Sequence, residues 1–252
     1  MTIFSPRTWA ERLSRGKSLW RHLPPEFGHA PLLVSPDAAL KLLKPGHKAF
    51  DPMLLRFCDE YVKKGSVGWD VGANVGIFTL AAAQRGGDVL AIEPDIFLYS
   101  LLCRTRHHRK NQSLSFEPLC SAIAAKPGTA RLAIAKRGRA SNFLEKFEGR
   151  SQTGGVRETF LVPVLTLDLL LQEHKKPDLI KIDVEGAEAD VLEGATKILS
   201  EVRPVMLIEV GESTSENVIS LLKKFNFQIY DYETGFEVHD SDGSFANILA
   251  RP

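Results

Sequence analysis

The sequence has little of the material from which extracellular, metal-binding or membrane-spanning proteins are built. Its three cysteines, Cys58, Cys103 and Cys120, are scattered and form no Cys-x-x-Cys pair, so we expect reduced thiols with structural roles. No apolar run approaches the roughly 18 residues of a transmembrane helix, and the N-terminus lacks the apolar core of a signal peptide. We therefore expect a cytoplasmic protein without stable membrane insertion.

An excess of charge of either sign is also missing. The 252 residues include 32 lysines and arginines against 31 aspartates and glutamates. Nucleic-acid-binding domains usually carry a basic excess, so this balance argues against a nucleic-acid partner. The chain is long enough to bury a large core, and its 44% hydrophobic content suits one domain with an appendage.

Residues 1–50 form the predicted appendage, and residues 51–252 form the main domain. Basic residues and tryptophans are interleaved in the first 22 residues, which predicts a short basic amphipathic helix. This helix could contact a membrane surface or an anionic partner, but packing on its own domain or on a second subunit is favoured. A homo-oligomer would then form through this segment. Asp51-Pro52 predicts the start of the first helix of the main domain.

Predicted strands and helices alternate through the main domain. Most of the strands are apolar throughout, which indicates an α/β protein whose mostly parallel sheet is covered by helices on both faces. No helix separates the last two strands, so one edge of the sheet should be antiparallel. The polar, glycine-rich segment 136–155 is expected to be a mobile loop. The predicted strands are 67–71, 89–92, 114–119, 130–135, 159–164, 179–184, 205–209, 227–230 and 245–249, and the predicted helices are 53–62, 77–83, 96–106, 165–172, 188–201 and 216–225.

Residues 67–80 predict a strand, a glycine turn and a helix, which is the layout of a nucleotide-binding crossover. No Gly-Lys-Ser/Thr follows, so the turn is not a P-loop, and the third glycine of a dinucleotide fingerprint is missing. Gly72 and Gly76 would let the backbone approach a ligand where a Cβ would clash. Free N–H groups at the start of the helix would face that ligand. A tight turn that binds nothing explains two glycines equally well.

Two acids favour a nucleoside ligand. Glu93 ends the second strand about 20 residues after Gly72, which is the spacing at which a carboxylate reaches ribose hydroxyls. Asp70 would be unfavourable beside a pyrophosphate, whereas the sulfonium and ammonium groups of S-adenosylmethionine suit an acid. These residues favour S-adenosylmethionine over NAD. An NAD-dependent oxidoreductase is the alternative, and a non-catalytic cofactor-binding module is another.

Several motifs together resemble those of the FkbM-type methyltransferases over about residues 50–250. This resemblance implies the class I methyltransferase fold, which is Rossmann-like with seven strands, an antiparallel last strand and helices on both faces. It also implies S-adenosylmethionine-dependent methylation, mostly of oxygen. The motifs are DVGANVGIFTL from Asp70 to Leu80, Glu93-Pro94, Thr166-Leu167-Asp168, DLIKIDVEGAE from Asp178 to Glu188, and Val191 to Ala195.

The resemblance also assigns expected roles to single positions. Glu93 would hold the ribose, and Asp183 would lie nearest the methyl group. A hydroxyl acceptor must lose a proton, so a general base is expected, with Asp183 as the first candidate and Glu185 as the second. The alternative role of Glu185 is that of an acid near a helix N-terminus, where the helix dipole favours a negative charge. We expect a small molecule or a sugar as the acceptor and predict no metal site. The remaining cofactor-binding positions are Asp70, Gly72, Asn74 and Gly76 for the methionine part, and Ser121 and Ala122 for the adenine.

Overall fold

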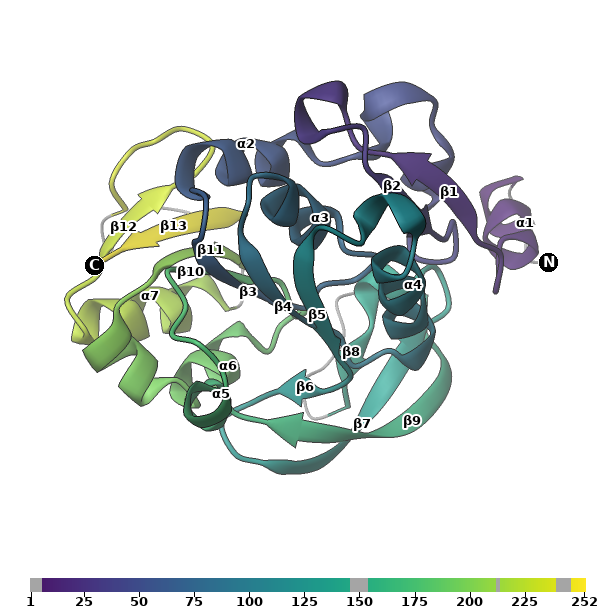
Figure 1. The fold of residues 1–252 in the computed structure, drawn as a ribbon. Helices are drawn as coiled ribbons and strands as arrows, with labels where there is room; N and C mark the ends of the chain where they lie inside the picture. The colour runs from purple at the N-terminus through teal and green to yellow at the C-terminus, as the bar shows by residue number, and fades with distance from the viewer. Residues whose placement is uncertain (1–5, 146–153, 212–213, 239–245) are drawn as a thin grey trace.

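A computed structural model describes residues 6–145, 154–211, 214–238 and 246–252. Within these ranges a seven-stranded sheet has the order β12-β13-β11-β10-β3-β4-β5 (Figure 1). β13 is antiparallel to both of its neighbours, and the other adjacent strands are parallel. The predicted class I methyltransferase topology is thereby confirmed. The strands are β3 Val67–Val71, β4 Asp88–Ile92, β5 Ser115–Leu119, β10 Leu179–Ile182, β11 Val205–Glu209, β12 Gln228–Asp231 and β13 Asn247–Arg251.

Helices cover both faces of this sheet. Because successive side chains of a strand point to opposite faces, the sheet separates two hydrophobic cores. Val89 of β4 packs in the core beneath α2 Pro52–Tyr61, α3 Ile77–Gln84 and α4 Ile96–Arg106. Its neighbour Leu90 packs in the core beneath α5 Leu167–Glu173, α6 Glu188–Glu193 and α7 Ser215–Lys224. This arrangement confirms the prediction of helices on both faces.

Polar side chains cap the first turns of three helices, and the start at Asp51-Pro52 was predicted from the sequence. Asp51 Oδ1 accepts a hydrogen bond from the Met53 N–H at 2.9 Å, with Pro52 in the first helical position of α2. Asp95 caps α4 in the same way, and Thr166 caps α5. Each cap satisfies an N–H group that has no partner inside its helix.

The continuous helix predicted over 188–201 is wrong. α6 ends at Glu193, a turn follows at Gly194, and Ile198–Val202 forms a π-helical turn. The Asp168 carboxylate accepts hydrogen bonds from the backbone N–H groups of Lys197 and Ile198. It therefore caps the start of the second helical segment. A Cβ at Gly194 would lie 2.4 Å from the backbone oxygen of Ala124, so this turn is also a point of close packing.

A second, four-stranded sheet has the order β6-β9-β7-β8. The predicted strands 130–135 and 159–164 are confirmed in β7 Gly128–Ala135 and β9 Val156–Leu165, which pair with each other. The other two strands are β6 Ala122–Ile123 and β8 Phe143–Leu144. β8 lies inside the segment expected to be a loop, and Arg139–Ser141 forms a short 3-10 helix there. Residues 146–153 of that segment, and Phe245 of the last predicted strand, lie outside the described residues.

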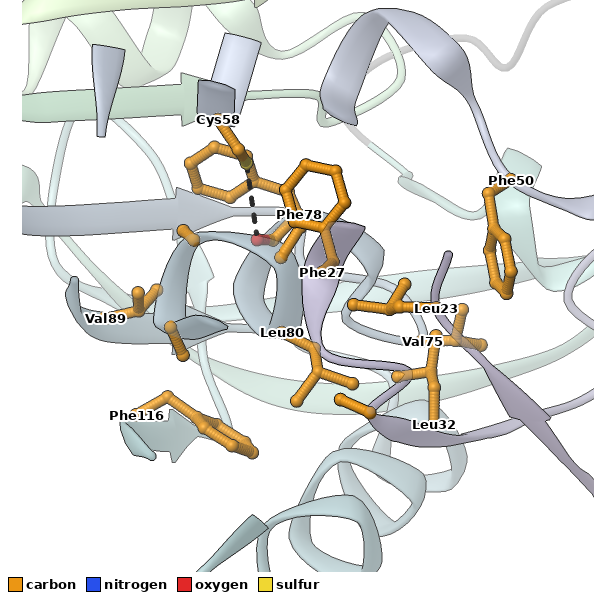
Figure 2. Packing of buried hydrophobic residues seen from close by; sticks show 14 of the residues in the cluster. Leu23, Phe27, Leu32, Phe50, Cys58, Val75, Phe78, Leu80, Val89 and Phe116 are labelled. Atoms are coloured by element: carbon orange, nitrogen blue, oxygen red, sulfur yellow. Dashed lines mark hydrogen bonds between the residues drawn. The ribbon is translucent and has the colours of Figure 1, made fainter. Parts of the chain in front are cut away.

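The N-terminal segment packs on the α3 and α4 side of the main domain. It contains α1 Pro6–Leu13, which confirms the predicted short helix, and a hairpin of β1 Leu19–His22 and β2 Pro31–Val34. Figure 2 shows Leu23, Phe27 and Leu32 beside Phe78 and Leu80 of α3, in one shared core. For the first 22 residues, packing on the same domain or on a second subunit stays a prediction, since Trp9, Leu13 and Trp20 are exposed. The domain boundary at residue 50 stays a prediction.

The helices in the described ranges are all too short or too polar to cross a lipid bilayer.

Candidate active site

Two adjoining cavities open at the carboxyl ends of β3, β4 and β10, where open parallel sheets bind their ligands. The cavity that we call the Glu93 cavity is lined by Gly72, Glu93, Ser121, Ala122, Arg139 and their neighbours. The Lys181 cavity has a volume of about 240 Å³ and is lined by Lys181, Glu209, Asn247, Asp51, Leu42 and their neighbours. Four residues line both cavities: Asn74, Ala140, Asp183 and Glu185.

The turn after β3 is held tightly by its surroundings. Gly72 has a φ of +76°, and a Cβ there would lie 1.9 Å from the backbone oxygen of Asp183. At Gly76 a Cβ would lie 2.4 Å from Leu102 Cδ2 on α4. Both glycines are therefore required by the close approach of protein atoms. Gly72 also lines the Glu93 cavity, as the sequence predicts for a ligand-binding turn.

Asn74 presents an unsatisfied acceptor at the junction of the two cavities. It adopts a left-handed conformation with a φ of +53°, and its backbone N–H donates to Glu93 Oε2 at 2.8 Å. Its side-chain oxygen, Oδ1, is buried, and no described residue donates a hydrogen bond to it. A buried carbonyl oxygen normally has a donor, so this atom suits a ligand that carries N–H groups.

Glu93 is held by two backbone donors. Its Oε1 accepts from the Asp95 N–H at 2.8 Å, and its Oε2 accepts from the Asn74 N–H at the same distance. Each carboxylate oxygen keeps a second acceptor position for a hydroxyl group. Burial raises the pKa of the Glu93 carboxyl to about 8, and the two N–H donors oppose this rise.

Lys181 connects two of the predicted acids. Its Nζ donates to the backbone oxygen of Gly72 at 2.5 Å and lies 3.2 Å from Asp70 Oδ1 and 3.6 Å from Asp183 Oδ2. Burial lowers the pKa of Lys181, but the negative charges of Asp70 and Asp183 raise it by more than burial lowers it. The pKa of Lys181 therefore lies above its ordinary value. The structure thus pairs Lys181 with both Asp70 and Asp183.

Asp70 is fully buried and makes its contacts inside the protein. Its Oδ2 accepts a hydrogen bond from the Thr79 hydroxyl at 2.5 Å, and its Oδ1 faces Lys181. Asp70 therefore acts on the cavities through Lys181. Ser121 likewise directs its hydroxyl to backbone oxygens, those of Ala122 and Pro163, while it lines the Glu93 cavity.

Sequence reasoning missed several residues of the cavity walls. Arg139 and Asn142 lie in the segment expected to be a loop, where an arginine resembles any solvated base. Lys41 and Leu42 come from the N-terminal segment, and Asn247 comes from β13. No local motif surrounds these five residues, so only the fold identifies them.

The sequence of residues 70–229 matches the family model described as the methyltransferase FkbM domain. The chain belongs to the FkbM methyltransferase family. This match covers more than half of the chain and includes the β3 turn, Glu93 and the Asp183 region. The chain therefore contains the domain of a methyltransferase family, and the match favours S-adenosylmethionine over the dinucleotide alternative.

Solved structures of other methyltransferases are distantly similar to this FkbM methyltransferase. Methyltransferase FkbM from Methylobacillus flagellatus KT is 18% identical, with a TM-score of 0.49 over 81% of this chain and 51% of the other. A 16S rRNA methyltransferase from T. thermophilus, in complex with AdoMet and guanosine, is 12% identical, with a TM-score of 0.48 over 93% of this chain and 50% of the other. A TehB-like SAM-dependent methyltransferase from Corynebacterium glutamicum is 11% identical, with a TM-score of 0.45 over 79% and 88%.

This chain thus spans about half the length of the similar FkbM structure. Comparison with curated proteins finds no match.

The chemistry of S-adenosylmethionine fits the groups that the FkbM domain presents. The Asn74 Oδ1 atom needs a donor, and the ammonium group of the methionine part carries three N–H bonds. The second acceptor positions of Glu93 suit the two ribose hydroxyls. These two features therefore fit the amino-acid part and the ribose of the same cofactor.

With Glu93 as the ribose-binding residue that the sequence predicts, its pKa predicts that nucleoside binding tightens as the pH rises through about 8. The ionised carboxylate is the stronger acceptor, so at lower pH the carboxyl must first release its proton. The Kd for 5′-methylthioadenosine, which has no group that titrates in this range, should be about tenfold higher at pH 7 than at pH 9. Calorimetry measures this profile. Glu93→Gln should give a flat profile, and a flat profile in the unmodified protein would contradict the prediction.

The same shift acts on stability in the opposite direction. Between the ordinary value of 4.5 and about 8, the folded protein holds a Glu93 proton that the unfolded chain has released. The contribution of Glu93 to the free energy of unfolding therefore falls as the pH rises through this window.

Proposed function

We propose that this methyltransferase transfers the methyl group to a hydroxyl of a small molecule or a sugar. The observation that carries the proposal is the position of Asp183, which lines both the Glu93 cavity and the Lys181 cavity. When bound, S-adenosylmethionine supplies an electrophilic methyl group, so the protein mainly aligns the donor and the acceptor. A carboxylate between the two cavities can contact both.

We assign the Glu93 cavity to the nucleoside of the cofactor. Glu93 would accept hydrogen bonds from the ribose hydroxyls, and Ser121 and Ala122 would flank the adenine. Asn74 would accept from the ammonium group of the methionine part at the junction with the Lys181 cavity. Gly72 shapes the turn at this junction. Asp70 and Gly76 support the methionine part indirectly, through Lys181 and through packing on α4.

We assign the role of general base to Asp183. Its side chain is partly exposed, and Lys181 Nζ lies 3.6 Å from its Oδ2, so the ammonium group orients the carboxylate. Asp183 would take the proton of the attacking hydroxyl while the oxygen bonds to the methyl carbon. The electron pair of the breaking carbon–sulfur bond stays on the sulfur. Glu185, which lines the same two cavities, is the second candidate.

The lining of the Lys181 cavity supports a hydroxyl-rich acceptor. Asp51, Glu209 and Asn247 carry carboxylate and amide groups, which accept hydrogen bonds from hydroxyls. The volume of about 240 Å³ suits a small molecule or a single sugar. Both features favour a compact polar acceptor over a polymer.

Transfer of an isotope-labelled methyl group tests the proposal. The protein is incubated with labelled S-adenosylmethionine and separate pools of neutral sugars, small alcohols, amines and RNA, and the products are read by mass spectrometry. We expect label on a hydroxyl oxygen of a small molecule or sugar, and none with Glu93→Ala, in which cofactor binding should be sharply weakened. Label on nitrogen, carbon or RNA would contradict the proposal. Cofactor binding without transfer to any pool would favour the non-catalytic module.

A further inference from the structure

The guanidinium of Arg139 is paired with two buried carboxylates. Its Nη1 donates to both oxygens of Asp95, at 2.9 and 2.6 Å, and its Nε donates to Asp37 Oδ2 at 3.0 Å. The side chains of Asp95 and Asp37 are only 0% and 3% exposed. Loss of the arginine would leave both acids buried with fewer positive partners, which is strongly unfavourable.

Asp95 connects this ion pair to Glu93. The Asp95 N–H donates to Glu93 Oε1 at 2.8 Å, and the Asp95 carboxylate caps α4 through the Phe97 N–H. The guanidinium also lies 4.7 Å from the centroid of the Phe97 ring. Arg139 thus holds Asp95 in place, and the backbone N–H of Asp95 in turn orients one oxygen of the Glu93 carboxylate.

Arg139 also connects one wall of the Glu93 cavity to the N-terminal segment. Arg139, Asn142, Phe143 and Leu144 all line that cavity. The backbone N–H of Arg139 donates to the backbone oxygen of Asp37 at 2.8 Å. The side-chain Nδ2 of Asn142 donates to Asp95 Oδ2 at 2.7 Å. Asp37 precedes residues 70–229, so the N-terminal segment contributes to a site that the family match alone does not contain.

We propose that Arg139 is a positioning residue for S-adenosylmethionine. It acts through Asp95 on Glu93 and through Asp37 on the wall formed by residues 139–144. The N-terminal segment is then part of the cofactor site, because it anchors the arginine. This role is independent of the identity of the methyl acceptor.

Calorimetry with S-adenosylhomocysteine tests the proposal. In Arg139→Met and in Asp95→Asn we expect the Kd to rise by roughly tenfold to a hundredfold, because small displacements of a binding group are costly. Asparagine still caps a helix, so Asp95→Asn removes the charge and keeps the cap of α4. The double variant should bind about as weakly as the weaker single variant, because both changes break one linkage. With an acceptor in hand, the KM for S-adenosylmethionine should rise more than kcat falls.

Arg157→Met is the matched control. Arg157 donates to both oxygens of Asp37, at 3.1 and 3.3 Å, but none of its hydrogen bonds reaches Asp95 among the described residues. Its Kd should stay within about threefold of the unmodified protein, since Arg139 still holds Asp95. Thermal unfolding of each variant without ligand identifies a temperature at which all of them are folded, and the calorimetry is done at that temperature.

Two results would overturn the proposal. One is an unchanged Kd in Arg139→Met, and the other is equal weakening in Arg139→Met and Arg157→Met, which would indicate a general loss of stability. If Arg139→Met does not fold, Arg139→Lys decides the question, because lysine keeps the charge but not the planar fork. Unchanged binding in Arg139→Lys would then also reject the proposal.

Discussion

Replacing Asp183 with asparagine is expected to lower the rate of methyl transfer by roughly a hundredfold to ten-thousandfold, the usual contribution of a general base. Asparagine keeps the size of the side chain but cannot take a proton at neutral pH. The Kd for S-adenosylhomocysteine should change by no more than about threefold, because Glu93 and Asn74 provide the main cofactor contacts in our assignment. Initial rates with labelled S-adenosylmethionine and the acceptor found by the transfer screen measure the first quantity, and calorimetry measures the second.

Glu185→Gln is the matched control for this experiment. Glu185 lines the same two cavities as Asp183 but has a left-handed backbone, with a φ of +54°, in the turn after β10. We expect a smaller loss of rate in this variant. A rate in Asp183→Asn close to that of the unmodified protein would remove Asp183 from the catalytic residues. A larger loss in Glu185→Gln would transfer the role of base to Glu185.

Lys181→Met is expected to lower the free energy of unfolding by about 3–5 kcal/mol, the usual cost of removing one partner of a buried ion pair. Lys181 is 4% exposed and Asp70 is fully buried, so the methionine leaves the buried Asp70 carboxylate without the cation that faces its Oδ1. The turn at Gly72 also loses the donor to its backbone oxygen. Urea unfolding in the absence of ligand measures the change.

Lys175→Met is the control for the loss of a lysine. Lys175 pairs with Asp88 at 2.8 Å, but its side chain is 74% exposed, so its removal should have little effect on stability. Asp70→Asn in the Lys181→Met background should restore part of the lost stability, because the unpaired charge is gone. The explanation by charge burial would be rejected if this double variant were less stable than Lys181→Met alone.

Much of the site follows from local patterns in the sequence. The apolar strands fix the parallel sheet, and the sheet brings the ends of β3, β4 and β10 together. The register places Lys181 of β10 beside Asp70 of β3, and Asp70 beside Ala91 of β4. The position of Glu93 close to the β3 turn is therefore readable from spacing alone.

The Arg139 contacts were not predictable in this way. Its two buried carboxylate partners lie 102 and 44 residues away along the chain, and no periodicity connects them. A polar, glycine-rich segment has the composition of a solvated loop, whereas ion pairs to buried acids hold its described part in place. The break at Gly194 was missed for a similar reason, since Asp168, which caps the second half, belongs to another helix.

The antiparallel strand β13 has a consequence for the order of assembly. Within the described part of the sheet, β12 pairs with β13, and β13 pairs with β11. β12 is made earlier during synthesis, yet it cannot join the sheet until β13 has inserted between it and β11. Asn247, the first residue of β13, lines the Lys181 cavity. A nascent chain could therefore form the Glu93 cavity first, and the Lys181 cavity would be completed only when β13 joins the sheet.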